Sequence, residues 1–405
     1  MDANAPELEW LVSVDDHVIE PPNVWVDRAP AKWRDQVPRL IDDAWEYDGK
    51  RVGTSGLSVT IGKRKEEFTP NPVPYSEMPE AAYDPVARLV DMDRAGILGS
   101  LCFPSFPRFC GQIFWEAKDK ELAMLCVRAY NDWMIDEWCG AAPGRCIPLV
   151  IIPLWDPAAA AAEIERTAGK GARTFAFSEN PEPLGLPTIN DRQRYWDPVM
   201  AAANDTGMVV SMHVGSSSTM PSIWSDAPGL ANLTFGAART AGTMIGWLFS
   251  DMFDRFPNLK IVLSEGNIGW MPYFIERAEQ VIDKQRHWAK RMNVQMYQGS
   301  SGAQAEDPVP QADLDTLDVR RRFRDHIYGC FIEETAGLRC LDIIGEDNVM
   351  IETDYPHTDS TWPHCIDVAL AQLEGQTDQV KQKVLVDNAA RVFNIDLPTP
   401  PVVAR

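Results

Sequence analysis

The feature of this sequence that most constrains its fold is a series of short apolar runs that recur between residues 11 and 354. The runs are almost continuously apolar and do not alternate with polar residues, which is typical of strands covered on both faces. We therefore predict a parallel sheet with buried strands. The predicted strands lie at residues 11–15, 99–104, 146–153, 172–178, 208–214, 260–265, 326–332 and 348–354.

Segments of helical length and pattern separate these runs, and several of them end in Gly or Pro, which are common helix stops. Alternating strands and helices are typical of an α/β fold with a parallel sheet. Eight such units favour a closed (β/α)8 barrel, the TIM barrel, over a doubly wound sheet. The predicted helices include residues 121–140, 157–170, 195–207, 242–257 and 335–345.

Two stretches interrupt the alternation. Residues 20–82 follow the first strand, are rich in Pro, and contain a hairpin signal at Tyr47-Asp48-Gly49-Lys50. Residues 296–318 precede the seventh strand, and their polar, Gly- and Pro-containing composition predicts a loop. Neither stretch resembles an independent domain, so we expect one barrel domain over residues 1–405. Both insertions could cap the barrel mouth, or they could be solvated surface loops.

Charge and composition exclude several classes of function. The net charge of −21 argues against nucleic acids and against anionic membrane surfaces as partners, because both require Lys and Arg. No run approaches the roughly 18 apolar residues of a membrane span, and the acidic opening MDANAPELEW does not resemble a signal peptide. The eight cysteines form no CxxC pair. We expect a cytoplasmic protein that acts on a small molecule and could form a homo-oligomer.

Side chains that can bind metal ions stand at the C-terminal ends of the predicted strands. In a (β/α)8 barrel these ends converge on one face, where active sites are built. The convergence would turn scattered residues into a single metal site. The candidate ligands are Asp15, His17, Glu179, His213, Glu265 and Asp354.

The local arguments for these residues differ. Asp15 and His17 are two positions apart on a strand, so both side chains can face the barrel centre. Glu265 and Asp354 follow buried strands, where an unpaired charge is costly and needs a partner. His213 is followed by a Gly/Ser loop. Each residue also has an ordinary alternative. Asp15 and His17 could lie in a solvated turn, His213 could be a hydrogen-bonded core residue, an Arg could pair with Glu265 or Asp354, and Glu179 could lie on the surface.

Four segments resemble the amidohydrolase-related family, which includes aminocarboxymuconate-semialdehyde decarboxylase and resorcylate-type decarboxylases. The resemblance covers nearly the whole chain and implies a (β/α)8 barrel that is either a metal-dependent hydrolase or a non-oxidative decarboxylase. The segments are VDDHVIEPP, SEGNIGWMPYFIER, ETDYPHTDSTWP and QKVLVDNAARVFNI.

The departures from the family pattern point to a hydrolase. The family's decarboxylases usually carry His-x-His or Glu-x-His on the first strand, a catalytic His on the sixth, and one metal; here Asp15 and Glu265 occupy those positions. The six candidates instead match the layout of the superfamily's two-metal hydrolases, with Glu179 as the bridging ligand. Because the ligand set is rich in carboxylates, we expect two divalent metals per chain, iron in preference to manganese or zinc.

The expected reaction is attack of a metal-bound hydroxide on a carbonyl, with a bulky acyl thioester such as an acyl-CoA as the favoured substrate. Asp354 would accept the proton of the attacking water, and His357 would act as an acid or hold a ligand, unless it merely packs in its loop. Alternatives remain open: a one-metal decarboxylase of an aromatic or enol carboxylate, a hydrolase of esters, lactones or amides, or a binding protein without activity.

Overall fold

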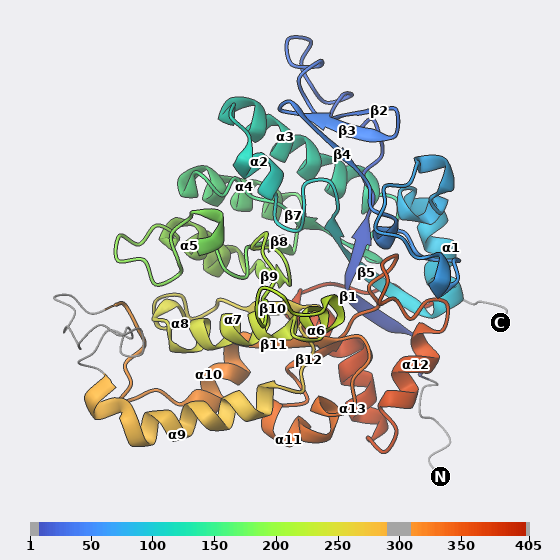
Figure 1. Cartoon of the computed structure of the whole chain (residues 1–405). Coiled ribbons are helices and arrows are strands. Elements are labelled where there is room, and N and C mark those ends of the chain that lie inside the picture. The colour runs from blue at the N-terminus through green and yellow to red at the C-terminus, as the bar shows by residue number, and fades with distance from the viewer. Residues whose placement is uncertain (1–7, 290–308, 402–405) are drawn as a thin grey trace.

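The protein is described by a computed structural model that covers residues 8–289 and 309–401. Its centre is a barrel of parallel strands surrounded by helices (Figure 1). Pro148 lacks an amide hydrogen and separates β6 from β7, so these two short strands share one position in the barrel. The strands are β1 (Leu11–Val18), β5 (Ile97–Pro104), β6 (Cys146–Ile147), β7 (Leu149–Val150), β8 (Thr174–Ala176), β9 (Val209–His213), β10 (Ile261–Ser264), β11 (Ile327–Phe331) and β12 (Val349–Ile351).

Hydrogen bonds between the first and last strands close the barrel. The amide of Asp354 donates to the carbonyl of Asp15 (2.9 Å), and the amide of His17 donates to the carbonyl of Tyr355 (2.6 Å). Each neighbouring pair elsewhere in the barrel is parallel. The predicted strands and the predicted (β/α)8 barrel are therefore confirmed.

The helices follow the predicted segments with some differences. The predicted helix at residues 242–257 is divided in two, because Ser250 adopts an extended conformation between α7 and α8. The longest helix, α9, was missing from the predicted set. The helices are α1 (Pro85–Ala95), α2 (Gln112–Glu116), α3 (Lys120–Trp133), α4 (Pro157–Gly169), α5 (Asp197–Thr206), α6 (Gly229–Thr234), α7 (Ala237–Phe249), α8 (Met252–Arg255), α9 (Met271–Ala289), α10 (Val319–His326), α11 (Leu341–Ile344), α12 (Cys365–Gln372), α13 (Asp378–Gln382) and α14 (Asn388–Val392).

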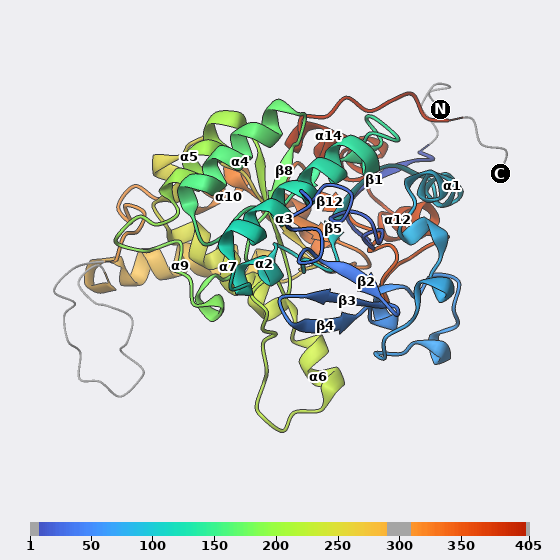
Figure 2. The same cartoon turned by 90° about the horizontal axis from the view of Figure 1, so that it is seen from above.

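The stretch at residues 20–82 contains a small antiparallel sheet of β2 (Arg39–Ile41), β3 (Ala44–Tyr47) and β4 (Lys50–Gly53). Asp48 and Gly49 have φ values of +49° and +74°, as a tight hairpin turn requires, so the predicted hairpin is present. Figure 2 shows this sheet and α6 projecting on the same side of the barrel.

The second predicted insertion is only partly covered. Residues 296–308 lie outside the described residues, while residues 309–318 form an irregular segment that leads into α10. Among the helices that the structure describes, none is both long and apolar enough to cross a membrane.

Candidate metal centre

Four of the predicted ligands come together at one end of the barrel. The Nε2 atom of His17 lies 3.1 Å from Asp354 Oδ1 and 3.6 Å from Asp15 Oδ1. The Nε2 atom of His213 lies 3.4 Å from Asp15 Oδ2. All four side chains are buried. They come from the ends of β1, β9 and β12, so the convergence follows from the closed parallel barrel.

The facing atoms of this cluster are close together without forming hydrogen bonds to one another. Both carboxylate oxygens of Asp15 and of Asp354, and Nε2 of His17 and of His213, have no hydrogen-bond partner among the described residues. The Nδ1 of His213 lies 2.5 Å from the carbonyl of Val214 and must donate to it, which leaves Nε2 as a free acceptor. Buried, unpaired acceptors that lie this close together fit a divalent cation.

The electrostatics of the cluster agree with this fit. Burial lowers the pKa of His213 to about 4 and that of His17 well below its ordinary value, so both rings are neutral near pH 7. Burial and the neighbouring Glu352 and Glu265 carboxylates raise the pKa of Asp15. Burial acts in the same direction on Asp354, but the His357 and His17 rings lower its pKa overall. A bound cation would relieve the crowding of these carboxylates.

Aromatic rings form one wall of the centre. The ring of His357 stacks on His17 with centroids 3.5 Å apart, and its Nδ1 is 3.2 Å from Asp354 Oδ1. His17, Asp354 and His357 thus form a second group of mutually close donors beside the first group of Asp15, His17 and His213. Phe109 stacks on His213 at 4.0 Å. The rings keep the imidazoles in place and limit access of water.

Glu265 lies at the open edge of the cluster. Its Oε2 is 3.4 Å from His213 Nε2, and its side chain keeps 22% of its surface exposed. Burial and the Asp354 and Glu352 carboxylates raise its pKa well above the ordinary value. Both Glu265 and Asp354 have positive φ values, of +55° and +50°, which turn their side chains at the strand ends.

Glu352 is a residue that the sequence analysis missed. It is buried, its Oε2 accepts from the amide of Glu265 (3.1 Å), and its Oε1 has no partner within the described chain. The sequence does contain a signal for Glu352. It precedes Asp354 by two positions, and the two-residue periodicity of a strand places both side chains on the same side of the strand. A charged residue inside the apolar run at residues 348–354 would have identified it.

Glu179 belongs to neither of the two groups of close donors among the described residues. Its Oε1 accepts from the amide of Gly215 (2.9 Å) and from Ser217 Oγ (3.0 Å), so this oxygen is engaged by the loop after β9. Burial raises the pKa of Glu179 to about 7. The predicted bridging role receives no support from this arrangement.

A second buried residue, Asp16, faces away from the ligands and holds the strands that carry them. Its carboxylate accepts from Thr353 Oγ1 (2.6 Å), from the amide of Tyr355 (3.0 Å) and from the hydroxyls of Ser13 and Ser100. Asp16 lies between two ligands of β1, and Thr353 and Tyr355 lie on either side of Asp354. This carboxylate therefore fixes the register between both parts of the cluster.

Arg88 supports the same contact between β1 and the segment after β12, from outside the barrel. Its guanidinium is buried, donates to the carbonyl of His17 (2.7 Å), and lies over the rings of Trp138 and Tyr355. The charge of Arg88 also compensates the Asp16 carboxylate.

The family model described as Amidohydrolase matches residues 19–395. The chain belongs to the amidohydrolase family. A γ-resorcylate decarboxylase from Rhizobium sp. (strain MTP-10005) is 25% identical over 291 residues, which cover 69% of this chain and 79% of the relative.

Two solved structures share the amidohydrolase fold. An amidohydrolase from Mycobacterium avium subsp. paratuberculosis K-10 has a TM-score of 0.67 and 19% identity, covering 95% of this chain and 99% of that one. A 5-carboxyvanillate decarboxylase from Novosphingobium aromaticivorans, with bound manganese, has a TM-score of 0.64 and 16% identity over 97% of this chain and 99% of that one.

These relatives correct the expected function. The curated relatives that match are decarboxylases of an aromatic carboxylate, so the expected hydrolysis of a bulky acyl thioester is wrong. The expectation of two iron ions also lacks support; manganese is the ion bound in solved structures of a 5-carboxyvanillate decarboxylase and a dihydroxybenzoic acid decarboxylase. The error arose from treating Asp15 and Glu265 as marks of a two-metal layout. In the structure, Glu179 belongs to neither group of close donors among the described residues, and its Oε1 is engaged by the loop after β9.

Proposed function

We propose that this protein is a one-metal, non-oxidative decarboxylase of an aromatic carboxylate. The observation that carries the proposal is the buried cluster of unpaired donor atoms of Asp15, His17, His213 and Asp354, with the carboxyl of Glu265 at its accessible edge. The matching decarboxylases support the same reaction class.

Asp15, His17, His213 and Asp354 would hold the divalent cation. Two neutral imidazoles and two carboxylates suit manganese, which is the ion in the related 5-carboxyvanillate decarboxylase structure. When bound, the cation supplies positive charge that attracts the substrate carboxylate and a neighbouring phenolic oxygen.

Glu265 is the proposed proton donor. Its carboxyl is close to the cluster and partly exposed, so it can reach a ring that lies over the mouth. It transfers a proton to the ring carbon that bears the carboxylate. The carbon–carbon bond then breaks, its electron pair restores the aromatic ring, and CO₂ leaves. The carboxylate of Glu265 regains a proton from water, so one proton is consumed for each CO₂ released.

His357 has a supporting role in this proposal. Its Nε2 has no partner in the described part of the chain, and 16% of its side chain is exposed. Through Nδ1 it contacts Asp354, and through its ring face it covers His17. It can therefore hold these two groups and offer one hydrogen bond to a substrate hydroxyl.

The test is to load the purified protein with manganese and assay CO₂ release from 2,6-dihydroxybenzoate and other phenolic carboxylates, with metal content measured on the same sample. We expect about one manganese per active chain and CO₂ release in step with formation of the phenol. Thiol release from acyl-CoA substrates without any CO₂ release, or a requirement for two metals per active chain, would refute the proposal.

A further inference from the structure

Glu179 has no role in the proposed reaction, yet its carboxylate is held rigidly. Besides the bonds from Gly215 and Ser217 to Oε1, its amide donates to Ser216 Oγ (2.8 Å) and its carbonyl accepts from Thr243 Oγ1 (2.9 Å). The side chain is only 5% exposed. Its second oxygen, Oε2, has no hydrogen-bond partner among the described residues. A fixed, buried acceptor without a partner is costly unless a water or a ligand satisfies it.

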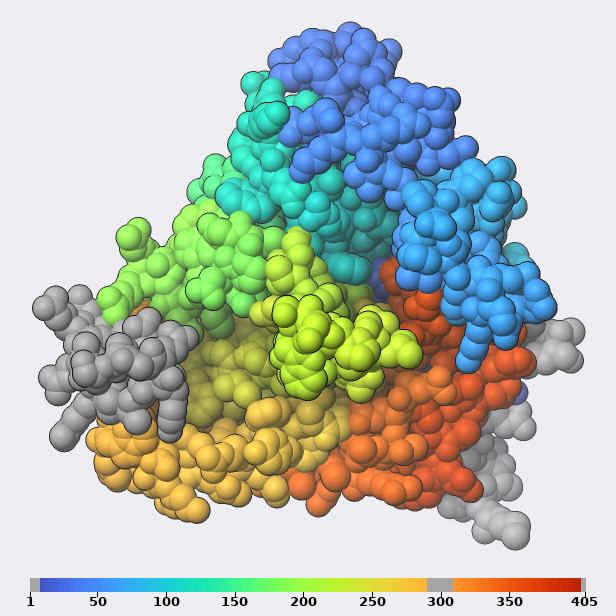
Figure 3. All heavy atoms as spheres, in the orientation of Figure 1, coloured from blue at the N-terminus to red at the C-terminus, as the bar shows by residue number. Residues whose placement is uncertain are grey.

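Glu179 lines a cavity of about 500 Å³ between the loop after β8, the α6 segment and α7. Two other polar atoms on its lining residues are also buried without a partner in the described chain, namely Asn190 Oδ1 and Arg239 Nε. Ile189 and Trp247 provide apolar walls. Figure 3 shows the α6 segment standing out from the centre of this face of the molecule, beside α7.

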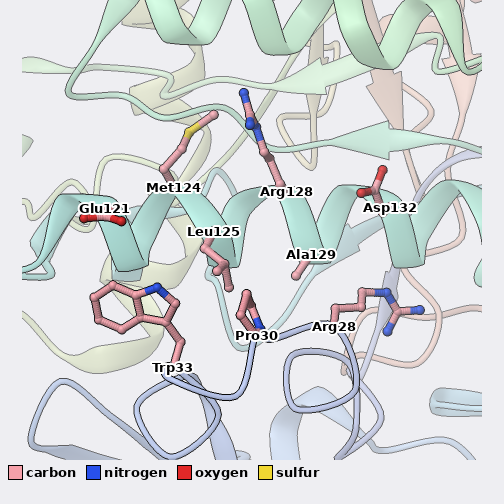
Figure 4. A pocket seen from close by; sticks show the side chains of 9 residues that line it. All are labelled: Arg28, Pro30, Trp33, Glu121, Met124, Leu125, Arg128, Ala129 and Asp132. Carbon is pink, nitrogen blue, oxygen red and sulfur yellow. The ribbon is translucent and has the colours of Figure 1, made fainter.

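A second cavity differs from the Glu179 cavity in how its charged side chains are paired. It measures about 730 Å³ and lies between α3 and the loop that carries Arg28 and Trp33 (Figure 4). Its charged side chains are satisfied by the protein itself: Arg28 pairs with Glu137, and Asp132 accepts from Arg166 and Lys170. The Glu179 cavity differs because its polar groups remain available to a ligand.

The chemistry of the lining defines the ligand. Glu179 Oε2 and Asn190 Oδ1 need donors, and Arg239 Nε needs an acceptor; hydroxyl groups supply both. Among the lining residues that the structure describes, only Glu179 and Arg239 are ionisable, and their opposite charges favour a neutral ligand. Ile189 and Trp247 add apolar surface that suits a ring, and the volume falls in the range of about 300–1,000 Å³ that is usual for small-molecule sites.

Two contacts connect the lining of the cavity to segments that carry the metal centre. Gly215, which binds Glu179, follows His213 by two residues. On the other side, α7 carries both Arg239 of the cavity and Thr240, which packs against Gly266; a Cβ at Gly266 would come within 2.4 Å of Thr240 Cγ2. Gly266 is adjacent to the proposed proton donor. The cavity is therefore positioned beside the mouth of the barrel.

We propose that this cavity binds a neutral, hydroxylated ring, which is the part of the substrate remote from the carboxylate that is lost. The substrate class is then a phenolic carboxylate larger than a single ring. The assignment to the substrate rests on the proposed decarboxylase function, whereas the ligand class of the cavity rests on its lining alone.

Glu179→Gln is the informative variant. Because Oε1 already accepts two donors, the carbonyl oxygen of the amide must take that place. The NH₂ group then takes the place of Oε2, where it presents a donor instead of an acceptor. Glu182→Gln is the matched control, since Glu182 is exposed, lies in the same loop and does not line the cavity. Asn190→Ala tests the second acceptor without touching the bonds that hold Glu179.

The binding experiment is calorimetric titration of the manganese-loaded protein with para,para′-dihydroxybiphenyl, a neutral two-ring phenol. We expect Glu179→Gln to weaken binding at least tenfold, Asn190→Ala about threefold, and Glu182→Gln not measurably. Equal affinity in the wild type and the Glu179 and Asn190 variants, or no binding to the wild type, would overturn the proposal. Loss of manganese from Glu179→Gln would also overturn it, by making Glu179 a ligand of the metal.

A kinetic experiment separates this proposal from the proposed function. Michaelis constants are measured for two carboxylates, the parent 2,6-dihydroxybenzoate and an analogue that carries a para-hydroxyphenyl group. In Glu179→Gln, we expect the ratio of the analogue's KM to the parent's KM to rise about tenfold over its value in the wild type. An unchanged ratio would overturn the substrate role of the cavity. Absence of CO₂ release from every carboxylate, with phenol binding intact, would refute the decarboxylase function and leave the ligand class of the cavity standing.

Discussion

Replacement of Asp16 by Ala tests whether the metal centre depends on the contact between β1 and the segment after β12. Asp16 binds no metal in the proposed site, but its buried carboxylate accepts from Thr353 Oγ1, the Tyr355 amide, and the hydroxyls of Ser13 and Ser100. Without it, the two strands lose the group that sets Asp354 opposite its partners on β1. We therefore expect both the stability and the metal affinity of Asp16→Ala to fall.

The magnitude follows from the bonds that are lost. The Tyr355 amide cannot rotate to another acceptor, and a buried donor left unpaired costs about 1–3 kcal/mol. The three hydroxyls can partly reorient, while Arg88 is left without its counter-charge. Together these losses give a decrease of about 3–5 kcal/mol in the free energy of unfolding. Loss of support behind metal ligands typically weakens metal binding by about 10- to 100-fold, and we expect the same range here.

The assay is a titration with Mn²⁺ followed by electron paramagnetic resonance of the free ion, alongside urea unfolding of the metal-free protein. Asn131→Ala is the matched control: Asn131 is buried and bonds both the amide and the carbonyl of Ile151, at 2.9 Å each, but lies far in sequence from every ligand. We expect Asn131→Ala to lower the free energy of unfolding. Its Kd for Mn²⁺ should change less than about threefold, well short of the 10- to 100-fold expected for Asp16→Ala. Equal changes of Kd in the two variants would refute the positioning role of Asp16.

Three further outcomes are expected. Glu265→Gln should lower kcat for CO₂ release by about 100-fold or more while manganese remains bound, because the amide cannot deliver the proton; unchanged turnover would exclude Glu265 as the donor. Removing manganese with a chelator should lower stability, by about 2.7 kcal/mol relative to protein held at 100 times Kd, as seen in the shift of the unfolding curve; no shift would argue against a structural metal centre. Burial raises the pKa of Glu20 to about 7, so the wild type binds its proton more tightly when folded and loses stability as the pH rises from about 4.5 to 7. Glu20→Gln should remove this slope, a difference on the order of 3 kcal/mol across the window in urea unfolding, whereas parallel pH profiles would contradict the assignment.

The barrel was predictable from the sequence because its strands are specified by local patterns. Apolar runs such as residues 208–214 and 260–265 mark buried parallel strands wherever they fall in the chain. The hairpin at Asp48 and Gly49 was predictable for a related reason, since the backbone conformation of a tight turn depends on two adjacent residues. The polar residues at strand ends, including Asp15, His17 and His213, followed once the barrel was assumed.

The sequence by itself therefore determined the fold, the family resemblance and a short set of candidate ligands. Only the tertiary structure decided which donors meet. Glu179 and His213 both end strands, but hydrogen bonds from a loop 36 residues away direct Glu179 into a separate cavity. Glu352 is brought beside Glu265, 87 positions away in the chain, by the parallel pairing of β10, β11 and β12. Such contacts depend on long-range packing and on the conformation of individual loops, which local residue patterns do not specify.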